Sequence, residues 1–290
     1  MIFQPTPFWI NTQKKKDPNT KQQTLNNNQG TLFRLTPLLL RAGMSRYDVA
    51  SEPTAEDIAE NYKDVMERIH AASEGRLVSL VAVSKTKSPA CLQALYNCGQ
   101  RCFGENYVQE MVEKAGVLPK DICWNFIGHL QSNKVKELLE GVEGLCLVQT
   151  VDSAKLANKL QDGCEKYRGG HALDVYVQVN TSGEESKSGT EPGKPAVELA
   201  QHIQEKCKLL KLAGLMTIGM PDYTSRPENF ECLLRTREAV AAALSVPVDS
   251  LALSMGMTGD FENAIKMGST VVRVGTALFG QRYYPKKVTA

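Results

Sequence analysis

Apolar residues in this chain fall into two alternating patterns. Short runs with few polar groups end at a turn signal, as 77–84 does before Ser88 and Pro89. Such runs are typical of strands that are buried on both faces of a parallel sheet. The stretches between them keep a helical spacing of apolar positions, as in 227–244, where Pro227 suits the first position of a helix.

The pattern predicts eight strands, near residues 78–84, 101–104, 122–127, 144–149, 173–180, 211–218, 250–254 and 270–274. Helix-like stretches separate them, among them 152–167, 195–206, 227–244 and 261–267. Before the first strand, Thr54-Ala55-Glu56-Asp57 has the form of a capping box, and Ile58, Tyr62, Val65 and Ile69 follow on one helical face. A first helix is therefore expected to start just after Thr54.

Eight strands with a helix after nearly every one match a (β/α)8 barrel. Residues 44–290 number 247, close to the roughly 250 typical of that fold. The predicted fold class is therefore α/β, a single (β/α)8 TIM barrel over residues 44–290. The alternative is an open doubly wound sheet, which usually has fewer strands and often carries a glycine fingerprint. Neither G-x-G-x-x-G nor a Walker loop occurs in the sequence.

Residues 1–43 differ from the rest in composition. They are rich in Asn, Gln, Lys and Thr and carry a net charge of +5, which leaves −3 for the remainder of a chain whose net charge is +2. This stretch is interpreted as a disordered or targeting leader. A cytoplasmic protein with a disordered tail upstream of Met44 is the main hypothesis, and a mitochondrial or plastid transit peptide is the alternative.

Net charge, the length of the apolar stretches and the numbers of cysteines and histidines limit the class of protein further. The near-neutral overall charge gives no reason to expect nucleic acid or membrane binding, and no apolar stretch approaches the ~20 residues that span a bilayer. Eight cysteines without a CxxC pair are typical of reduced thiols in an intracellular protein, and four scattered histidines do not suggest a metal site. A soluble protein without a metal is expected.

Lys85 directly follows the first predicted strand. In parallel α/β folds the carboxyl ends of the strands carry the ligand sites. A lysine desolvated there has its ammonium form disfavoured, and the neutral amine is the form that attacks a carbonyl. Lys85 is therefore a candidate for a Schiff base; the alternative is a lysine that only extends to solvent at a strand end.

The last two strands end in turns with small residues. The segment 254–259, with Ser254 and Gly256, follows the seventh strand, and Arg273, Gly275 and Thr276 close the eighth. A helix is expected immediately after each of these two segments. Barrels often bind phosphate at this place through backbone amides. A strand-end lysine opposite a phosphate site suits pyridoxal phosphate, and it also suits a sugar phosphate in a Schiff-base aldolase.

Arg273 helps to separate these ligands. It donates only and stays protonated, so beside a pyridine nitrogen it would hydrogen-bond the unprotonated ring. A ring that gains no proton is a weak electron sink, so such a site would bind the cofactor well and catalyse carbanion chemistry poorly.

Polar residues also follow other strands, at 103–107, 127–134, 180–189 and 216–221. Helix caps and turns explain the polar residues of any one of these segments equally well.

Taken together, six blocks resemble the pyridoxal phosphate homeostasis protein family: residues 82–87, 103–107, 127–134, 186–189, 253–257 and 272–276. The resemblance runs from about Thr54 to Tyr284 and implies a barrel related to the N-terminal domain of alanine racemase. It further implies that Lys85 holds pyridoxal 5′-phosphate as a Schiff base and that Arg273 faces the ring nitrogen. The remaining implied cofactor contacts are Ser254 and the backbone near Gly256, Gly275 and Thr276 for the phosphate, and Asn106 and His129 for the ring.

Two family lysines, Lys87 and Lys187, are matched without an assigned role. Thr258 replaces a serine usual in the family and keeps the hydroxyl. The resemblance implies a protein that buffers pyridoxal phosphate and delivers it to apoenzymes, as a monomer and without an assigned catalytic residue. A racemase- or decarboxylase-like enzyme is the alternative, although only 16 residues follow the last predicted strand and leave no room for the racemase's second domain.

Overall fold

The computed structural model describes residues 47, 51–184, 188–219 and 227–281. The predicted leader, residues 1–43, and the family lysine Lys187 lie outside the described residues.

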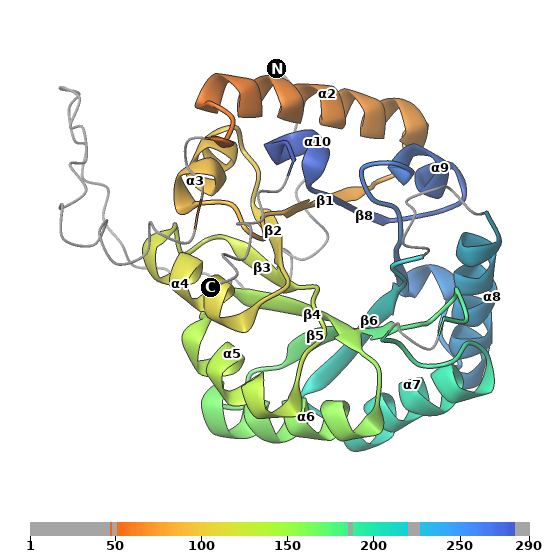
Figure 1. Ribbon diagram of the computed structural model, residues 1–290. Coiled ribbons are helices and arrows are strands. Elements are labelled where there is room, and N and C mark those ends of the chain that lie inside the picture. The colour runs from red at the N-terminus through yellow and green to blue at the C-terminus, as the bar shows by residue number, and fades with distance from the viewer. Residues whose placement is uncertain (1–46, 48–50, 185–187, 220–226, 282–290) are drawn as a thin grey trace, which may run out of the picture. The chain divides into compact units, whose positions relative to one another are not determined.

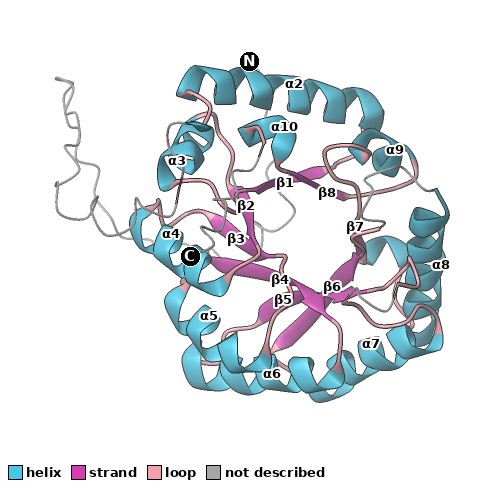
Figure 2. Cartoon of the chain, viewed as in Figure 1, coloured by secondary structure: helices cyan, strands magenta, loops and turns pink. Residues whose placement is uncertain are grey.

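Eight parallel strands form a closed barrel in which each strand pairs with its neighbour in sequence. The strands are β1 Ser79–Val83, β2 Cys102–Glu105, β3 Cys123–Phe126, β4 Leu145–Val151, β5 Leu173–Gln178, β6 Leu210–Met216, β7 Ala252–Ser254 and β8 Val271–Val274. Pairing of β8 with β1 closes the ring, which Figure 2 shows surrounded by helices. The predicted (β/α)8 barrel is therefore confirmed, and the open sheet is not the architecture.

The helices of the described part lie outside the ring (Figure 1). They are α2 Ala55–Ser73, α3 Pro89–Asn97, α4 Val108–Val117, α5 Val135–Gly141, α6 Ala154–Tyr167, α7 Lys194–Lys206, α8 Pro227–Leu244, α9 Phe261–Lys266 and α10 Thr276–Phe279, with short 3-10 turns η4 Ser132–Lys134 and η5 Val248–Ser250. Helix α9 begins after the segment 255–260, close to the expected start of the helix-like stretch 261–267. Helix α10 does begin directly after Gly275.

The first helix starts as the sequence predicts. The Thr54 hydroxyl accepts from the Asp57 amide at 3.1 Å, and the Asp57 carboxylate accepts from the Thr54 amide at 3.0 Å. This reciprocal cap satisfies two amide donors that a helix start otherwise leaves open. Ile58, Val65 and Ile69 are buried, so α2 packs its apolar face inward, against α3, α9 and α10.

The two faces of each strand meet different surroundings. On β1, Leu80 and Ala82 join the apolar layer beneath the helices, while Val81 lies on the opposite face, toward the barrel interior. Because both faces are buried, the strand is apolar throughout rather than alternating. The interior is not purely apolar, however. A hydrogen bond from Ser254 of β7 to Gln149 of β4 joins two strands that are not neighbours and so crosses the inside of the ring.

Candidate functional site

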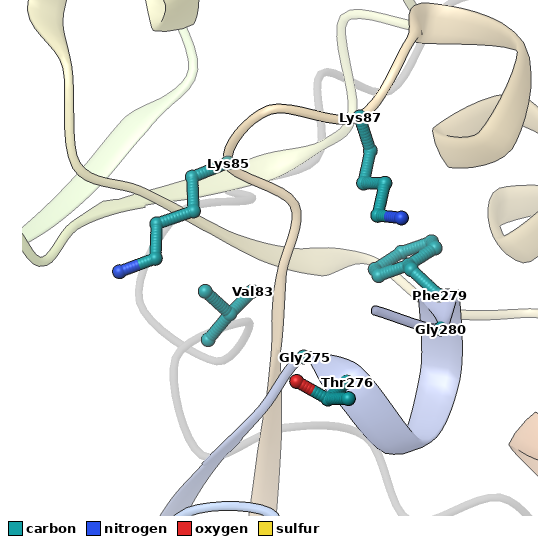
Figure 3. Close-up of a pocket in the computed structure, with 7 residues that line it drawn as sticks. All are labelled: Val83, Lys85, Lys87, Gly275, Thr276, Phe279 and Gly280. Atoms are coloured by element: carbon teal, nitrogen blue, oxygen red, sulfur yellow. The ribbon is translucent and has the colours of Figure 1, made fainter. Parts of the chain in front are cut away.

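Lys85 lies two residues beyond the carboxyl end of β1. It therefore lies at the carboxyl end of the barrel, in a turn that follows the strand. The chain turns here, because the Lys87 amide donates to the Ser84 carbonyl at 3.1 Å. Lys85 is half-buried, and Figure 3 shows it and Lys87 leaving this turn in different directions.

A depression opens beside the turn. It is lined by Val83, Lys85, Lys87, Gly275, Thr276, Phe279 and Gly280 (Figure 3). Three candidates from the sequence, Lys85, Gly275 and Thr276, therefore line one hollow, between strand ends that are hydrogen-bonded neighbours.

Gly275 allows this close approach of β8 to β1. A Cβ at this position would lie 3.1 Å from the Val83 carbonyl oxygen and 3.3 Å from the Val83 Cβ, tighter than most real contacts. The Gly275 carbonyl accepts from the amides of Leu278 and Phe279, each at 2.9 Å, and so starts α10. The backbone of this turn therefore borders the hollow, where it can contact a bound ligand.

Arg273 lies inside the barrel and is 5 % exposed. Its guanidinium donates to the Ser254 hydroxyl at 2.6 Å and to the Thr217 carbonyl at 2.7 Å, both of which are neutral groups. Burial lowers its pKa to about 10, partly opposed by the charge of Asp260, so the guanidinium is still protonated at neutral pH. Buried charges are normally paired, and a cation with neutral partners is suited to an anionic or electron-rich ligand.

Ser254 is the centre of a polar chain across the interior. Its hydroxyl donates to the Gln149 side-chain oxygen at 2.6 Å, and the Gln149 amide donates to Asn125 at 3.1 Å. The Gly256 carbonyl accepts from the Arg273 amide at 3.1 Å. Ser254 and Gly256 therefore lie beside Arg273 rather than among the residues that line the depression next to Lys85.

Gly256 has a structural reason to lack a side chain. Its φ is +94°, and a Cβ would lie 2.6 Å from the Ala264 Cβ and 3.0 Å from the Phe261 Cα. Glycine adopts such a φ without steric cost. The residue lets the chain after β7 pass close to α9.

Asn106 and His129 follow β2 and β3. A Cβ on Gly128 would lie 2.1 Å from the Asn106 carbonyl oxygen, so the two loops touch. The Asn106 side-chain oxygen is buried and has no hydrogen-bond partner in the described part of the chain. His129 is 57 % exposed and its Nδ1 lies 3.0 Å from the Ser188 hydroxyl and 3.5 Å from Asp152.

A buried ionic cluster lies on the other side of the Lys85 turn, between β2 and α4. The Lys114 ammonium donates to the Glu105 carboxylate, the Glu110 carboxylate and the Ser84 carbonyl, each at 2.7 Å. Burial, together with the Glu110 charge, raises the pKa of Glu105 to about 6 although Lys114 acts in the opposite direction. We call the side chains of Lys114, Glu105 and Glu110 the Lys114 cluster.

Sequence reasoning missed Gln149 and the Lys114 cluster. Gln149 could have been found, because it is a polar residue inside the apolar run of β4 and is fully buried. Lys114 gave no such signal, since a lysine on a helix is usually solvated. Lys87, matched without a role, is 5 % exposed and donates to the Gln281 carbonyl at 2.8 Å.

Within the described ranges, no group of three or more His, Cys, Asp or Glu side chains could hold a metal ion. No helix among the same residues is long and apolar enough to cross a membrane. What the site offers is a primary amine, a backbone turn and a buried guanidinium, a set suited to an anionic carbonyl compound.

Comparison with known proteins gives consistent matches. The sequence model of the family described as "Alanine racemase, N-terminal domain" matches residues 54–283. The human pyridoxal phosphate homeostasis protein is 46% identical over 218 residues, which are 72% of this chain and 78% of that protein.

Two solved structures are also similar. A protein of Bifidobacterium adolescentis has 38% identity and a TM-score of 0.69, and the match covers 78% of this chain and 95% of that one. PipY of Synechococcus elongatus PCC7942, solved with PLP bound, has 30% identity and a TM-score of 0.61, with 77% of this chain and all (100%) of PipY covered.

Proposed function

This chain belongs to the pyridoxal phosphate homeostasis protein family, and on that premise we propose that it binds pyridoxal 5′-phosphate (PLP), buffers it and delivers it. The observation that carries the proposal is the shared hollow of Lys85, Gly275 and Thr276 at the mouth of the barrel. Two further observations fit a bound PLP: the buried Arg273 with neutral partners, and the unpartnered, buried side-chain oxygen of Asn106 among the described residues.

We assign roles by chemistry. Lys85, as the neutral amine, holds the cofactor as a Schiff base; PLP supplies the aldehyde, and water is released. The backbone at Gly275 and Thr276, with Ser254 and the turn at Gly256, receives the phosphate. Asn106 and His129 flank the ring. The buried side-chain oxygen of Asn106, which accepts no hydrogen bond among the described residues, would accept one from the ligand.

Arg273 is the reason to propose a carrier rather than an enzyme. With a pKa of about 10 it keeps its proton at neutral pH and can only donate. Facing the ring nitrogen, it would leave that nitrogen unprotonated and the ring a weak electron sink. The side chain therefore favours holding PLP over racemisation or decarboxylation.

Borohydride trapping tests the proposal. The protein is incubated with PLP, reduced and digested, and the modified lysine is identified by peptide mass spectrometry. We expect a pyridoxyl adduct on Lys85, none there in Lys85→Ala, and wild-type labelling in Lys136→Ala, an exposed helix lysine. An adduct on another lysine refutes the assignment of Lys85, and no adduct at all refutes PLP binding as a Schiff base.

Delivery, oligomeric state and compartment need separate measurements. The carrier hypothesis requires that the loaded protein reactivate a PLP-dependent apoenzyme, whereas Lys85→Ala treated in the same way does not. We propose a monomer, which light scattering of the loaded protein checks. We also propose a cytoplasmic protein; N-terminal sequencing of the protein from cells tests it, since removal of residues 1–43 would indicate a transit peptide instead.

A further inference from the structure

The turn that carries Lys85 has a strained residue. Thr86 has φ +65°, a left-handed conformation that β-branched residues rarely adopt. It follows Lys85 in a turn closed by the Lys87 amide and the Ser84 carbonyl. Glycine is the residue that usually occupies such a position in a turn, so something outside the turn must hold Thr86 there.

The Lys114 cluster holds both residues next to Lys85. The Glu110 carboxylate accepts from the Thr86 amide at 2.6 Å, and the Lys114 ammonium donates to the Ser84 carbonyl at 2.7 Å. The Glu105 carboxylate accepts from the Ser84 hydroxyl at 2.6 Å. Lys85 is therefore the residue between two anchored neighbours.

The cluster is closed to solvent. Lys114 and Glu105 are fully buried and Glu110 is 6 % exposed in its side chain. The ammonium has three donors and meets three acceptors, two of them charged, so its hydrogen-bonding capacity is used up. These three bonds fix where the ammonium lies relative to the Ser84 carbonyl of the neighbouring turn.

We propose that Glu105, Glu110 and Lys114 are positioning residues for Lys85: from outside the barrel they hold the strained turn that aims the Lys85 amine into the mouth. None of the three is expected to touch PLP. The inference rests on the proposed function, since the amine is held in place for condensation with the PLP aldehyde.

The test asks whether relief of the backbone strain at Thr86 restores the rate of Schiff-base formation. Glu110→Ala removes the acceptor for the Thr86 amide, and we expect Schiff-base formation to slow at least about tenfold, because a misplacement on the order of 1 Å can cost up to about a hundredfold in rate. Adding Thr86→Gly should restore most of the rate, since glycine adopts a positive φ without an external anchor. The Thr86 hydroxyl has no partner among the described residues, so this replacement loses no described hydrogen bond.

Met111→Ala is the matched control. Met111 is fully buried on the same helix, so its truncation weakens α4 without touching the turn. We expect the rate of Schiff-base formation in this variant to stay within about twofold to threefold of the wild type, on the view that only misplacement of the amine slows the reaction. If Glu110→Ala does not fold, Glu110→Gln gives the same comparison with a smaller decrease, because it keeps an acceptor oxygen and loses the charge.

A second readout needs no cofactor. In the PLP-free protein, amide hydrogen exchange at Thr86 should be faster in Glu110→Ala than in the wild type and unchanged in Met111→Ala. The inference is overturned if Glu110→Ala reacts at the wild-type rate, if Met111→Ala slows equally, or if Thr86→Gly restores nothing. Wild-type protein that forms no adduct on Lys85 would instead refute the proposed function, so the two failures are distinguishable.

Discussion

Two buried cations of this barrel have different partners. Lys114, in the outer layer between β2 and α4, is bonded to two carboxylates and a carbonyl. Arg273, in the interior, is bonded to a hydroxyl and a carbonyl, both neutral. The charge of Lys114 is thus balanced by two hydrogen-bonded carboxylates, whereas Arg273 is influenced by the charge of Asp260 but donates to no carboxylate among the described residues. We propose that the outer cation organises the fold and that the interior cation serves binding.

The largest expected effect is on stability, at Lys114. Lys114→Met leaves two buried carboxylates without their cation and should lower the free energy of unfolding by about 3–5 kcal/mol. Urea denaturation of the PLP-free protein measures it. Lys136→Met, at an exposed lysine on α5, should change the same quantity by less than about 1 kcal/mol. A loss at Lys114 no larger than at Lys136 would show that the cluster does not stabilise the fold.

A smaller effect is expected from pH at Glu105. Its pKa is about 6 in the folded protein against a usual 4.5, so between these pH values the folded state holds more proton than the unfolded state. The protonated Glu105 carboxyl contributes its full stabilisation below about pH 4.5. This contribution to the free energy of unfolding, about 2 kcal/mol in total, is lost as the pH rises through 6. Burial is the main cause of the raised pKa and the Glu110 charge adds to it, whereas Lys114 and the Ser84 hydroxyl act in the opposite direction.

Comparison with Glu105→Gln isolates this contribution. Gln at this position keeps the shape and does not titrate, so the difference in unfolding free energy, wild type minus variant, should decrease between pH 4.5 and 6.5. Urea midpoints at several pH values give the difference. A value that is flat or increases with pH would contradict a raised pKa of Glu105.

The smallest effect on stability is expected at Arg273. Arg273→Met exchanges a buried charge with neutral partners for an apolar side chain, and such exchanges are often close to neutral, so we expect a change within about 1 kcal/mol in the PLP-free protein. Stabilisation by added PLP, measured as a shift in the thermal midpoint, should be strongly reduced. A variant that is as destabilised as Lys114→Met, or that keeps the full PLP shift, would remove the distinction between the two cations.

The sequence predicted the fold because its signals are local. The eight strands, and the helices at 152–167, 195–206, 227–244 and 261–267, lie within two residues of their predicted bounds, since apolar runs and helical spacing report burial directly. The capping box at Thr54 is likewise a contact between residues close in sequence.

The site was predicted less completely. The position of Lys85 directly after the first strand predicted that it lies at the barrel mouth. The turn after β8 was expected opposite Lys85, but β8 pairs with β1, so Gly275 and Thr276 line the same hollow beside it. The burial of Lys114 could not be read from its position on a helix, since it depends on packing of α4 against β2 and on the neighbouring turn. The partners of Ser254 depend on the closure of the barrel, which brings β4 and β7 face to face across the interior.

A crystal structure of the PLP-loaded protein tests the central claim most directly. The account predicts continuous density from the Lys85 Nζ to the cofactor, with the phosphate at Gly275 and Thr276 and the Arg273 guanidinium at the ring nitrogen. Density for PLP that is attached to a different lysine, or that lies outside the barrel mouth, would contradict it.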